Sequence, residues 1–229
     1  MSEGMVECGF CNTQSREGQH LCPSCGACLP LMSGGIAWER RREAGLASAL
    51  MHTVGGVFRS PSTVFAALRG SSSHVGAVIL VIVIGFFSSL IQAIWTMVLV
   101  PVEAKAALAG MLQNFSPAPL SQAFLDDAFR AVMIGQVALS PLFSVLALYL
   151  ETGLVWLALM IVGAEGRRFS VVLLIVAVSE IASLGVIIPQ VGGLLSMVLG
   201  VVFLTTGLTV RLRLGQGRAL LCALAPPVV

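Results

Sequence analysis

The sequence has few charged residues: only 10% of its 229 residues are Asp, Glu, Lys or Arg, whereas 57% are apolar. An ordinary soluble domain has about 25% charged and about 45–50% apolar residues. The scarcity of charge therefore excludes an ordinary soluble domain and predicts a membrane protein. The net charge is only +2, so bulk electrostatic attraction gives no reason to expect nucleic acid as a partner.

Several catalytic signatures are also missing. The three histidines, His20, His52 and His74, all precede the first long apolar run, so no intramembrane serine and histidine pair is available for proteolysis. Asp126 and Asp127 lie outside the expected spans, which excludes an intramembrane aspartyl dyad. The sequence contains neither an H-E-x-x-H motif nor a Walker loop. We therefore expect a protein that is not an enzyme.

A polar N-terminal part precedes a strongly apolar body. The first 14 residues lack the apolar region of a signal peptide, so the first apolar span is expected to act as an uncleaved signal anchor and a secreted soluble protein is excluded. A shift in composition near Gly70 divides the chain. We expect a zinc ribbon at residues 1–32, a basic linker with a membrane-surface helix at 33–70, and a transmembrane domain at 71–229.

Five of the six cysteines lie near the N-terminus, four of them with the spacing C-x2-C-x10-C-x2-C. Two such pairs provide the four thiolates of a tetrahedral zinc site, and the competing interpretation, a disulfide framework, needs an oxidising compartment. Cys28 is a spare thiol. A closed four-cysteine site has no open coordination position, so it stabilises a fold and catalyses nothing. We expect one structural Zn²⁺ bound by Cys8, Cys11, Cys22 and Cys25.

Long uncharged runs predict the membrane spans. The run at 76–100 is long enough, at about 1.5 Å per residue, to cross a hydrocarbon layer of about 30 Å. The apolar region at 131–163 is too long for one straight span, and Pro141 offers either a kink or a new helix start. Further spans are expected at 169–188 and 194–210, followed by a short fifth segment at 219–229. The expected fold is an all-α polytopic membrane protein, a five-segment helical bundle preceded by a small zinc ribbon.

Basic residues indicate the orientation of the chain. If the N-terminus is cytoplasmic, all of the 13 basic residues except Lys105 and Arg130 lie on the inner side. Five spans would then bring the C-terminus to the outer side, and the clustered cysteines would face a reducing compartment, which favours zinc. In the linker, Ser60 and Pro61 predict a helix start. This helix is expected either to lie on the membrane with arginines near anionic lipid headgroups or to be a solvated linker. The surface arginines are Arg40, Arg41, Arg42, Arg59 and Arg69.

Glu151 and Glu180 are the only ionisable residues well inside the predicted spans. Counted from the turn between the second and third spans, both reach about the same depth, near the midplane. An isolated carboxylate there is costly, so each is expected to be protonated, hydrogen-bonded to the other or beside water. The pair either shares a proton or binds a cation on a transport path, with Gln92 or Gln136 as accessory groups, or it only fixes the register of two helices.

Glycines recur every seven residues in the predicted fourth span, at Gly193, Gly200 and Gly207. Such a stripe allows another helix to approach closely, whereas scattered glycines are also common in membrane helices. The sequence leaves both interpretations open.

From Gly55 onward the chain resembles the Yip family (Ypt-interacting protein family) of five-span membrane proteins with cytoplasmic N-termini. The matching features are the stretch from Phe58 to Phe65 before the first span, the turn containing Gly163 followed by Arg168-Phe169-Ser170, the corner from Ile188 to Gly192, and Arg218-Ala219-Leu220 followed by Pro226-Pro227. The shortened fifth segment departs from that pattern. The resemblance, together with the ribbon, implies a bacterial inner-membrane protein that acts as an adaptor or organiser, without catalytic residues.

Two functions therefore stand as expectations. The favoured one is a non-catalytic membrane adaptor whose cytoplasmic zinc ribbon docks a protein or lipid partner, and whose helices associate with a partner or with a second copy. The rival is a small transporter, channel or lipid-handling protein that uses Glu151 and Glu180.

Overall fold

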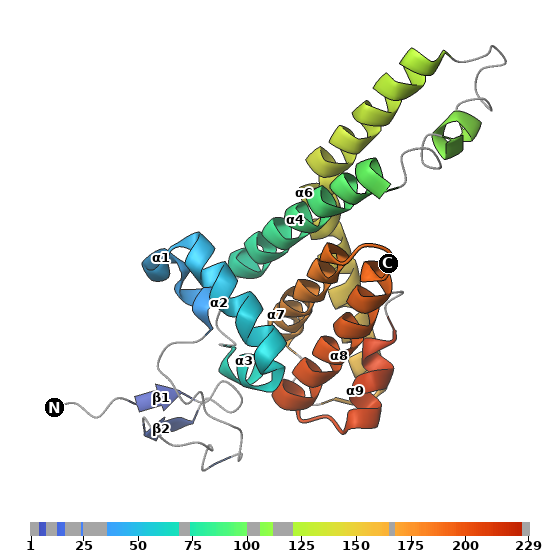
Figure 1. Cartoon of the computed structure of the whole chain (residues 1–229). Helices are drawn as coiled ribbons and strands as arrows, with labels where there is room; N and C mark the ends of the chain where they lie inside the picture. Colours follow the sequence, from blue (N-terminus) through green and yellow to red (C-terminus); the bar gives the residue numbers. More distant parts are fainter. Residues whose placement is uncertain are drawn as a thin grey trace.

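The computed structural model describes residues 5–7, 13–16, 24, 36–68, 74–99, 106–111, 121–164 and 168–225. Strands β1 (Met5–Glu7) and β2 (Gln14–Arg16) form an antiparallel pair in which Met5 faces Arg16. All other described elements are helical (Figure 1). They are η1 (Ala37–Arg40), α1 (Arg41–Ala44), α2 (Leu46–Arg59), α3 (Pro61–Ala67), α4 (His74–Leu99), a segment at 106–111, α6 (Gln122–Ile161), α7 (Phe169–Ser179), η2 (Glu180–Ile187), α8 (Gly192–Leu212) and α9 (Gln216–Ala223).

In the part of the chain that the structure describes, four helices are long and apolar enough to cross a membrane: α4, α6, α7 continued by η2, and α8. A helix satisfies its own backbone hydrogen bonds, which is the condition for an isolated segment to enter lipid. The expectation of a helical membrane domain with four full spans is confirmed at this level. The expected fifth span is not shown, because α9 has 8 residues, about 12 Å of helix against a hydrocarbon layer of about 30 Å.

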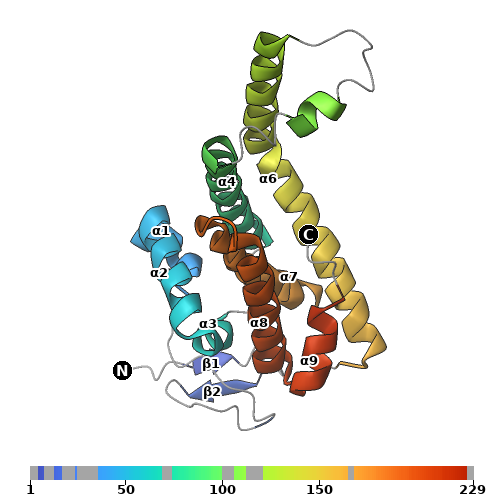
Figure 2. The same ribbon diagram turned by 45° about the vertical axis from the view of Figure 1, so that its right-hand side comes forward.

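The second span is part of one continuous helix, α6, which has 40 residues and includes Pro141. Its axis changes direction partway along (Figure 2). Pro141 has no N–H to donate to the carbonyl of Val137, four residues earlier, and the Ser140 hydroxyl donates to that carbonyl at 2.9 Å instead. The helix therefore continues through the proline, and residues 122–140 before it belong to the same element.

The third span changes helix type halfway along its length. Its second half, η2, is a 3₁₀ helix of 8 residues, whereas 3₁₀ runs longer than three or four residues are uncommon. Because a 3₁₀ helix rises about 2.0 Å per residue, the whole span reaches about 32 Å rather than about 28 Å. The uncharged run predicts this span at its observed position, but nothing in the residues predicts its 3₁₀ half.

Close packing of α8 against η2 depends on two glycines. A Cβ atom added at Gly192 would lie 2.7 Å from the Cα of Val186, and one added at Gly185 would lie 2.7 Å from the hydroxyl of Ser196. A Cβ atom at the neighbouring Gly193 would meet nothing within 4 Å. The close approach therefore uses Gly192, not the first glycine of the seven-residue stripe, and of that stripe only Gly207 is tightly packed.

Residues 36–68, which we call the collar, pack onto the bundle as η1, α1, α2 and α3. The indole of Trp38 donates to the carbonyl of Gly76 at 2.8 Å, and its backbone N–H donates to the Thr53 hydroxyl at 3.0 Å. Phe65 of α3 is fully buried, beside Gly207 of α8. α3 begins at Pro61, as the Ser60-Pro61 pair predicts, but its buried face packs on α8.

The N-terminal part of α6 projects beyond the rest of the bundle (Figure 1). Since α6 has 40 residues, it is about 60 Å long, twice the thickness of the hydrocarbon layer. A small separate cluster of Ala93, Phe129 and Met133, with Leu108 and Val137 packed against it, joins this part to the end of α4.

Candidate functional site

The candidate site is the pair Glu151 and Glu180, which the fold brings together from two spans. Glu151 lies in the C-terminal half of α6. Glu180 is the first residue of η2, directly after the end of α7. Their carboxyl groups are hydrogen-bonded to each other. Two residues that are 29 positions apart therefore meet because α6 and α7 are antiparallel neighbours joined by a short turn.

The hydrogen bond defines the protonation chemistry of the pair. A carboxylate only accepts hydrogen bonds, so one of the two groups must carry a proton for the bond to form. The sequence contains no Lys, Arg or His between residues 131 and 166 or between 169 and 210, so no cation on these two stretches neutralises the pair. Burying two ionised carboxylates side by side would be very unfavourable. Two carboxyl groups in this arrangement can share one proton.

The 3₁₀ geometry of η2 extends this polar site along the helix. In a 3₁₀ helix residues three apart lie on the same face, so Glu180 and Ser183 are aligned. The Ser183 hydroxyl is hydrogen-bonded to the hydroxyl of Ser88 on α4 at 2.9 Å. The Ser196 hydroxyl on α8 donates to the Ser183 carbonyl at 3.4 Å. We call Glu151, Glu180, Ser183, Ser88 and Ser196 the polar seam.

The polar seam was only partly predicted. Counting residues from the turn between the second and third spans predicts that the two glutamates lie at the same depth. Serines, however, are common in membrane helices, and nothing in the sequence distinguishes Ser88 or Ser183 from the others. The end of η2 is also bonded to α4, because the indole of Trp95 donates to the carbonyl of Ile187 at 3.2 Å. The suggested accessory groups, Gln92 and Gln136, are both exposed on their helices, and no hydrogen bond among the described residues joins either side chain to the seam.

Thr152 follows Glu151 on α6, and its buried hydroxyl has no hydrogen-bond partner among the described residues. An unsatisfied buried hydroxyl costs about 1–3 kcal/mol. Neighbouring residues in sequence point to different sides of a helix, so this hydroxyl is not counted in the polar seam.

The predicted surface arginines differ in their surroundings. Arg41 donates to the carbonyl of Trp38 at 3.1 Å, and its guanidinium carbon lies 5.3 Å from the Trp38 ring centre, so it binds to the collar itself. Arg42 and Arg59 are exposed. The side chain of Arg40 and the whole of Arg69 lie outside the described residues.

The predicted zinc ligands, Cys8, Cys11, Cys22 and Cys25, also lie outside the described residues. Strands β1 and β2 flank the sequence segment that contains Cys8 and Cys11. Within the described part of the chain, no group of three His, Cys, Asp or Glu residues could hold a metal ion. Zinc binding therefore stays a prediction from cysteine spacing.

Comparison with protein-family models, with curated proteins and with solved structures finds no match for this chain. The fold and the polar seam are therefore interpreted from the residues of the chain itself.

Proposed function

We propose that this protein is a non-catalytic integral membrane adaptor whose N-terminal zinc ribbon docks a protein or lipid partner. The collar is the observation that carries this proposal. Trp38, which follows the ribbon in sequence, makes buried hydrogen bonds to Gly76 and Thr53. These bonds, with Phe65 against α8, join the region behind the ribbon to the spans. A partner held by the ribbon is thereby coupled to the bundle or to a second copy of it.

In this proposal the bundle lies in a bacterial inner membrane with the collar end toward the cytoplasm. The contact of Phe65 with Gly207 near the end of α8 brings the collar to the end of the bundle that also carries Arg168, Arg211 and Arg213. Basic residues gather on the cytoplasmic side of membrane proteins.

The adaptor proposal is tested with full-length protein purified from native membranes. We expect about one zinc per chain and a co-purified partner from the parent protein. Cys11→Ser should remove both, because the site loses one of its four thiolates. Cys28→Ser, which removes a thiol outside the predicted ligand set, should leave both unchanged. Retention of the partner by a zinc-free Cys11→Ser protein would contradict docking through the ribbon.

A second function, proton or cation transfer, is favoured by the Glu151–Glu180 hydrogen bond and by the 3₁₀ helix that starts at Glu180. Interrupted α-helices commonly mark ion sites in membrane transporters. Proton flux into proteoliposomes should then require both carboxyl groups, so that Glu151→Gln with Glu180→Gln abolishes it. Asp127→Asn, which neutralises an exposed acid near the N-terminus of α6, is the matched control. Equal flux in all three proteins would eliminate this function.

A further inference from the structure

A cleft of about 400 Å³ lies between the second half of α8 and the start of α9. Its lining residues are Thr205, Thr206, Thr209, Val210, Gln216, Gly217 and Leu220. The volume falls within the range of about 300–1,000 Å³ typical of small-molecule sites. Four of these side chains are polar, although the cleft borders a helix that is apolar enough to cross a membrane. This cleft is separate from the polar seam and from the collar.

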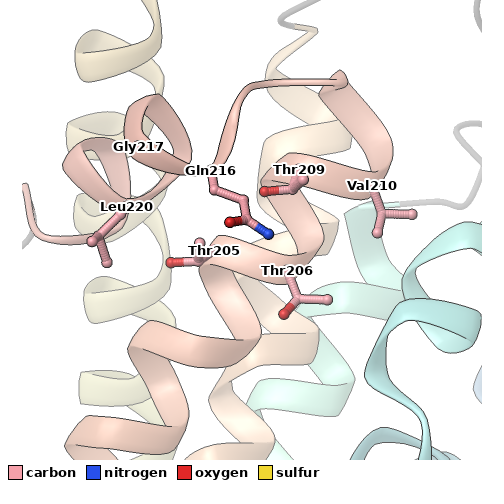
Figure 3. Close-up of a pocket in the computed structure, with 7 residues that line it drawn as sticks. All are labelled: Thr205, Thr206, Thr209, Val210, Gln216, Gly217 and Leu220. Atoms are coloured by element: carbon pink, nitrogen blue, oxygen red, sulfur yellow. The ribbon is translucent and has the colours of Figure 1, made fainter.

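The hydroxyl groups of the cleft are of two kinds. Thr206 donates to the carbonyl of Val202 at 2.7 Å, which is the usual way for a threonine to satisfy its hydroxyl within a helix. The hydroxyl oxygens of Thr205 and Thr209 are buried and have no hydrogen-bond partner among the described residues. Figure 3 shows both of them directed from α8 toward α9, with the Gln216 side chain beside them. These two donors, one helical turn apart, are therefore available to an acceptor placed between α8 and α9.

The charge around the cleft selects the kind of acceptor. Residues 181–229 contain three basic residues, Arg211, Arg213 and Arg218, and no acidic residue. Arg213 and Arg218 are exposed at the turn that joins α8 to α9. Thr209 and Thr205 lie about 4.5 Å and about 10 Å along the axis from the end of α8. A ligand of this cleft would therefore carry an anionic group near the arginines. It would also carry neutral hydrogen-bond acceptors one or two helical turns deeper, near Thr209 and Thr205.

We propose that this cleft binds the head region of an anionic phospholipid. The phosphate interacts with Arg213 and Arg218 at the membrane surface. The ester carbonyls of the lipid accept hydrogen bonds from Thr205 and Thr209, and the acyl chains follow Leu220 and the exposed Leu221 and Leu224 at the end of α9. This site differs from the surface arginines of the linker and does not depend on the zinc ribbon.

The test measures binding of phosphatidylglycerol with a fluorescent acyl chain to the full-length protein in a neutral detergent. We expect Thr205→Val with Thr209→Val to weaken binding at least tenfold, because valine keeps the shape of threonine but removes the donor. Thr206→Val, in the same cleft, should bind within twofold of the parent protein. Arg213→Gln with Arg218→Gln should also weaken binding and reduce its dependence on salt. Unchanged binding in the Thr205/Thr209 variant overturns the proposal.

Competition identifies the source of the ligand. Unlabelled phosphatidylglycerol should displace the probe, whereas phosphatidylcholine with the same acyl chains and glycerol phosphate should not. Equal displacement by phosphatidylcholine would mean unspecific contact with surrounding lipid and would overturn the proposal. Displacement by glycerol phosphate at the same concentration would overturn it in favour of a soluble phosphate ester. If the double threonine variant does not fold, Gln216→Ala, on the first residue of α9, tests the same cleft and should reduce affinity; unchanged affinity in that variant would also count against the proposal.

Discussion

The third span and the second span are made of similar residues but have different surroundings. In α7 and η2 the most apolar window is 61% buried within the protein, whereas in α6 the corresponding window is 17% buried. The third span is the central helix, in contact with α4, α6 and α8. α6 instead exposes Leu142, Phe143 and Leu146. Hydropathy shows only that both spans are apolar. Whether a given side chain contacts protein or lipid depends on which helices pack against it.

The largest expected difference concerns the packing of the central helix. Ile175→Ala on α7, a fully buried position, should lower the free energy of unfolding by about 3 kcal/mol, because a cavity remains where α7 meets α8. Leu146→Ala on α6, 55% exposed, should change it by less than about 0.5 kcal/mol. Unfolding by a denaturing detergent measures both. Similar losses for the two variants would mean that α6 is covered by another protein surface rather than by lipid.

Adding one methyl group at the contact between η2 and α8 should lower the free energy of unfolding almost as much as Ile175→Ala does. Gly192→Ala should cost about 2 kcal/mol, because its Cβ would overlap backbone atoms of residues 185 and 186 that cannot move aside. Gly193→Ala is the control, since its Cβ has open space, and it should be neutral or slightly stabilising. The same detergent titration gives both values, and equal effects would show that the two helices can separate freely.

The hydrogen bond between Glu151 and Glu180 is a polar link between the two spans compared here. Glu180→Leu should lower the free energy of unfolding by about 1 kcal/mol. Glu180→Gln should leave it unchanged, because the amide can donate a hydrogen bond to Glu151. Chemical unfolding of the two variants at a fixed pH makes the comparison. A leucine variant more stable than the parent protein would instead indicate that the pair is kept for function at a cost in stability.

The smallest expected effect concerns the bend in α6. Ser140→Ala removes the hydroxyl that occupies the carbonyl of Val137, and should cost about 0.5–1 kcal/mol. In the background of Pro141→Ala the same change should have almost no effect, because an alanine in place of the proline restores the helical N–H donor. A double-mutant cycle measures this coupling. A Ser140→Ala cost that is the same with and without the proline would refute the role assigned to the hydroxyl.

The sequence predicted the spans better than the elements between them. Uncharged runs located α4, the α7–η2 span and α8 to within a few residues, because their boundaries are set by charge and by solvation in lipid. Helix α2 was not predicted, because its buried positions are the small residues Ala49, Thr53 and Val57, which give little hydrophobic signal. The seven-residue stripe suggested Gly193, whereas the structure uses Gly192, because the close contact depends on where η2 ends.

For the candidate site the sequence supplied the residues and only part of the geometry. Counting residues from one turn placed Glu151 and Glu180 at one depth, since helical rise is constant. The alignment of Ser183 with Glu180 could not be predicted, because it depends on a 3₁₀ helix that local propensity does not favour. The cleft at Thr205 and Thr209 was also missed, because the sequence gives no indication of which hydroxyls a helix already satisfies.

The sequence by itself determined that this chain forms long apolar helices, and that two acids, Glu151 and Glu180, lie within the apolar runs. These properties depend on composition and on distance along the chain. Only the tertiary structure decided which helix is central, that the carboxyl groups bond to each other, and that two threonines face α9 with no hydrogen-bond partner among the described residues. These depend on contacts between distant segments, and in lipid such contacts are governed by close packing and hydrogen bonds rather than by hydrophobicity.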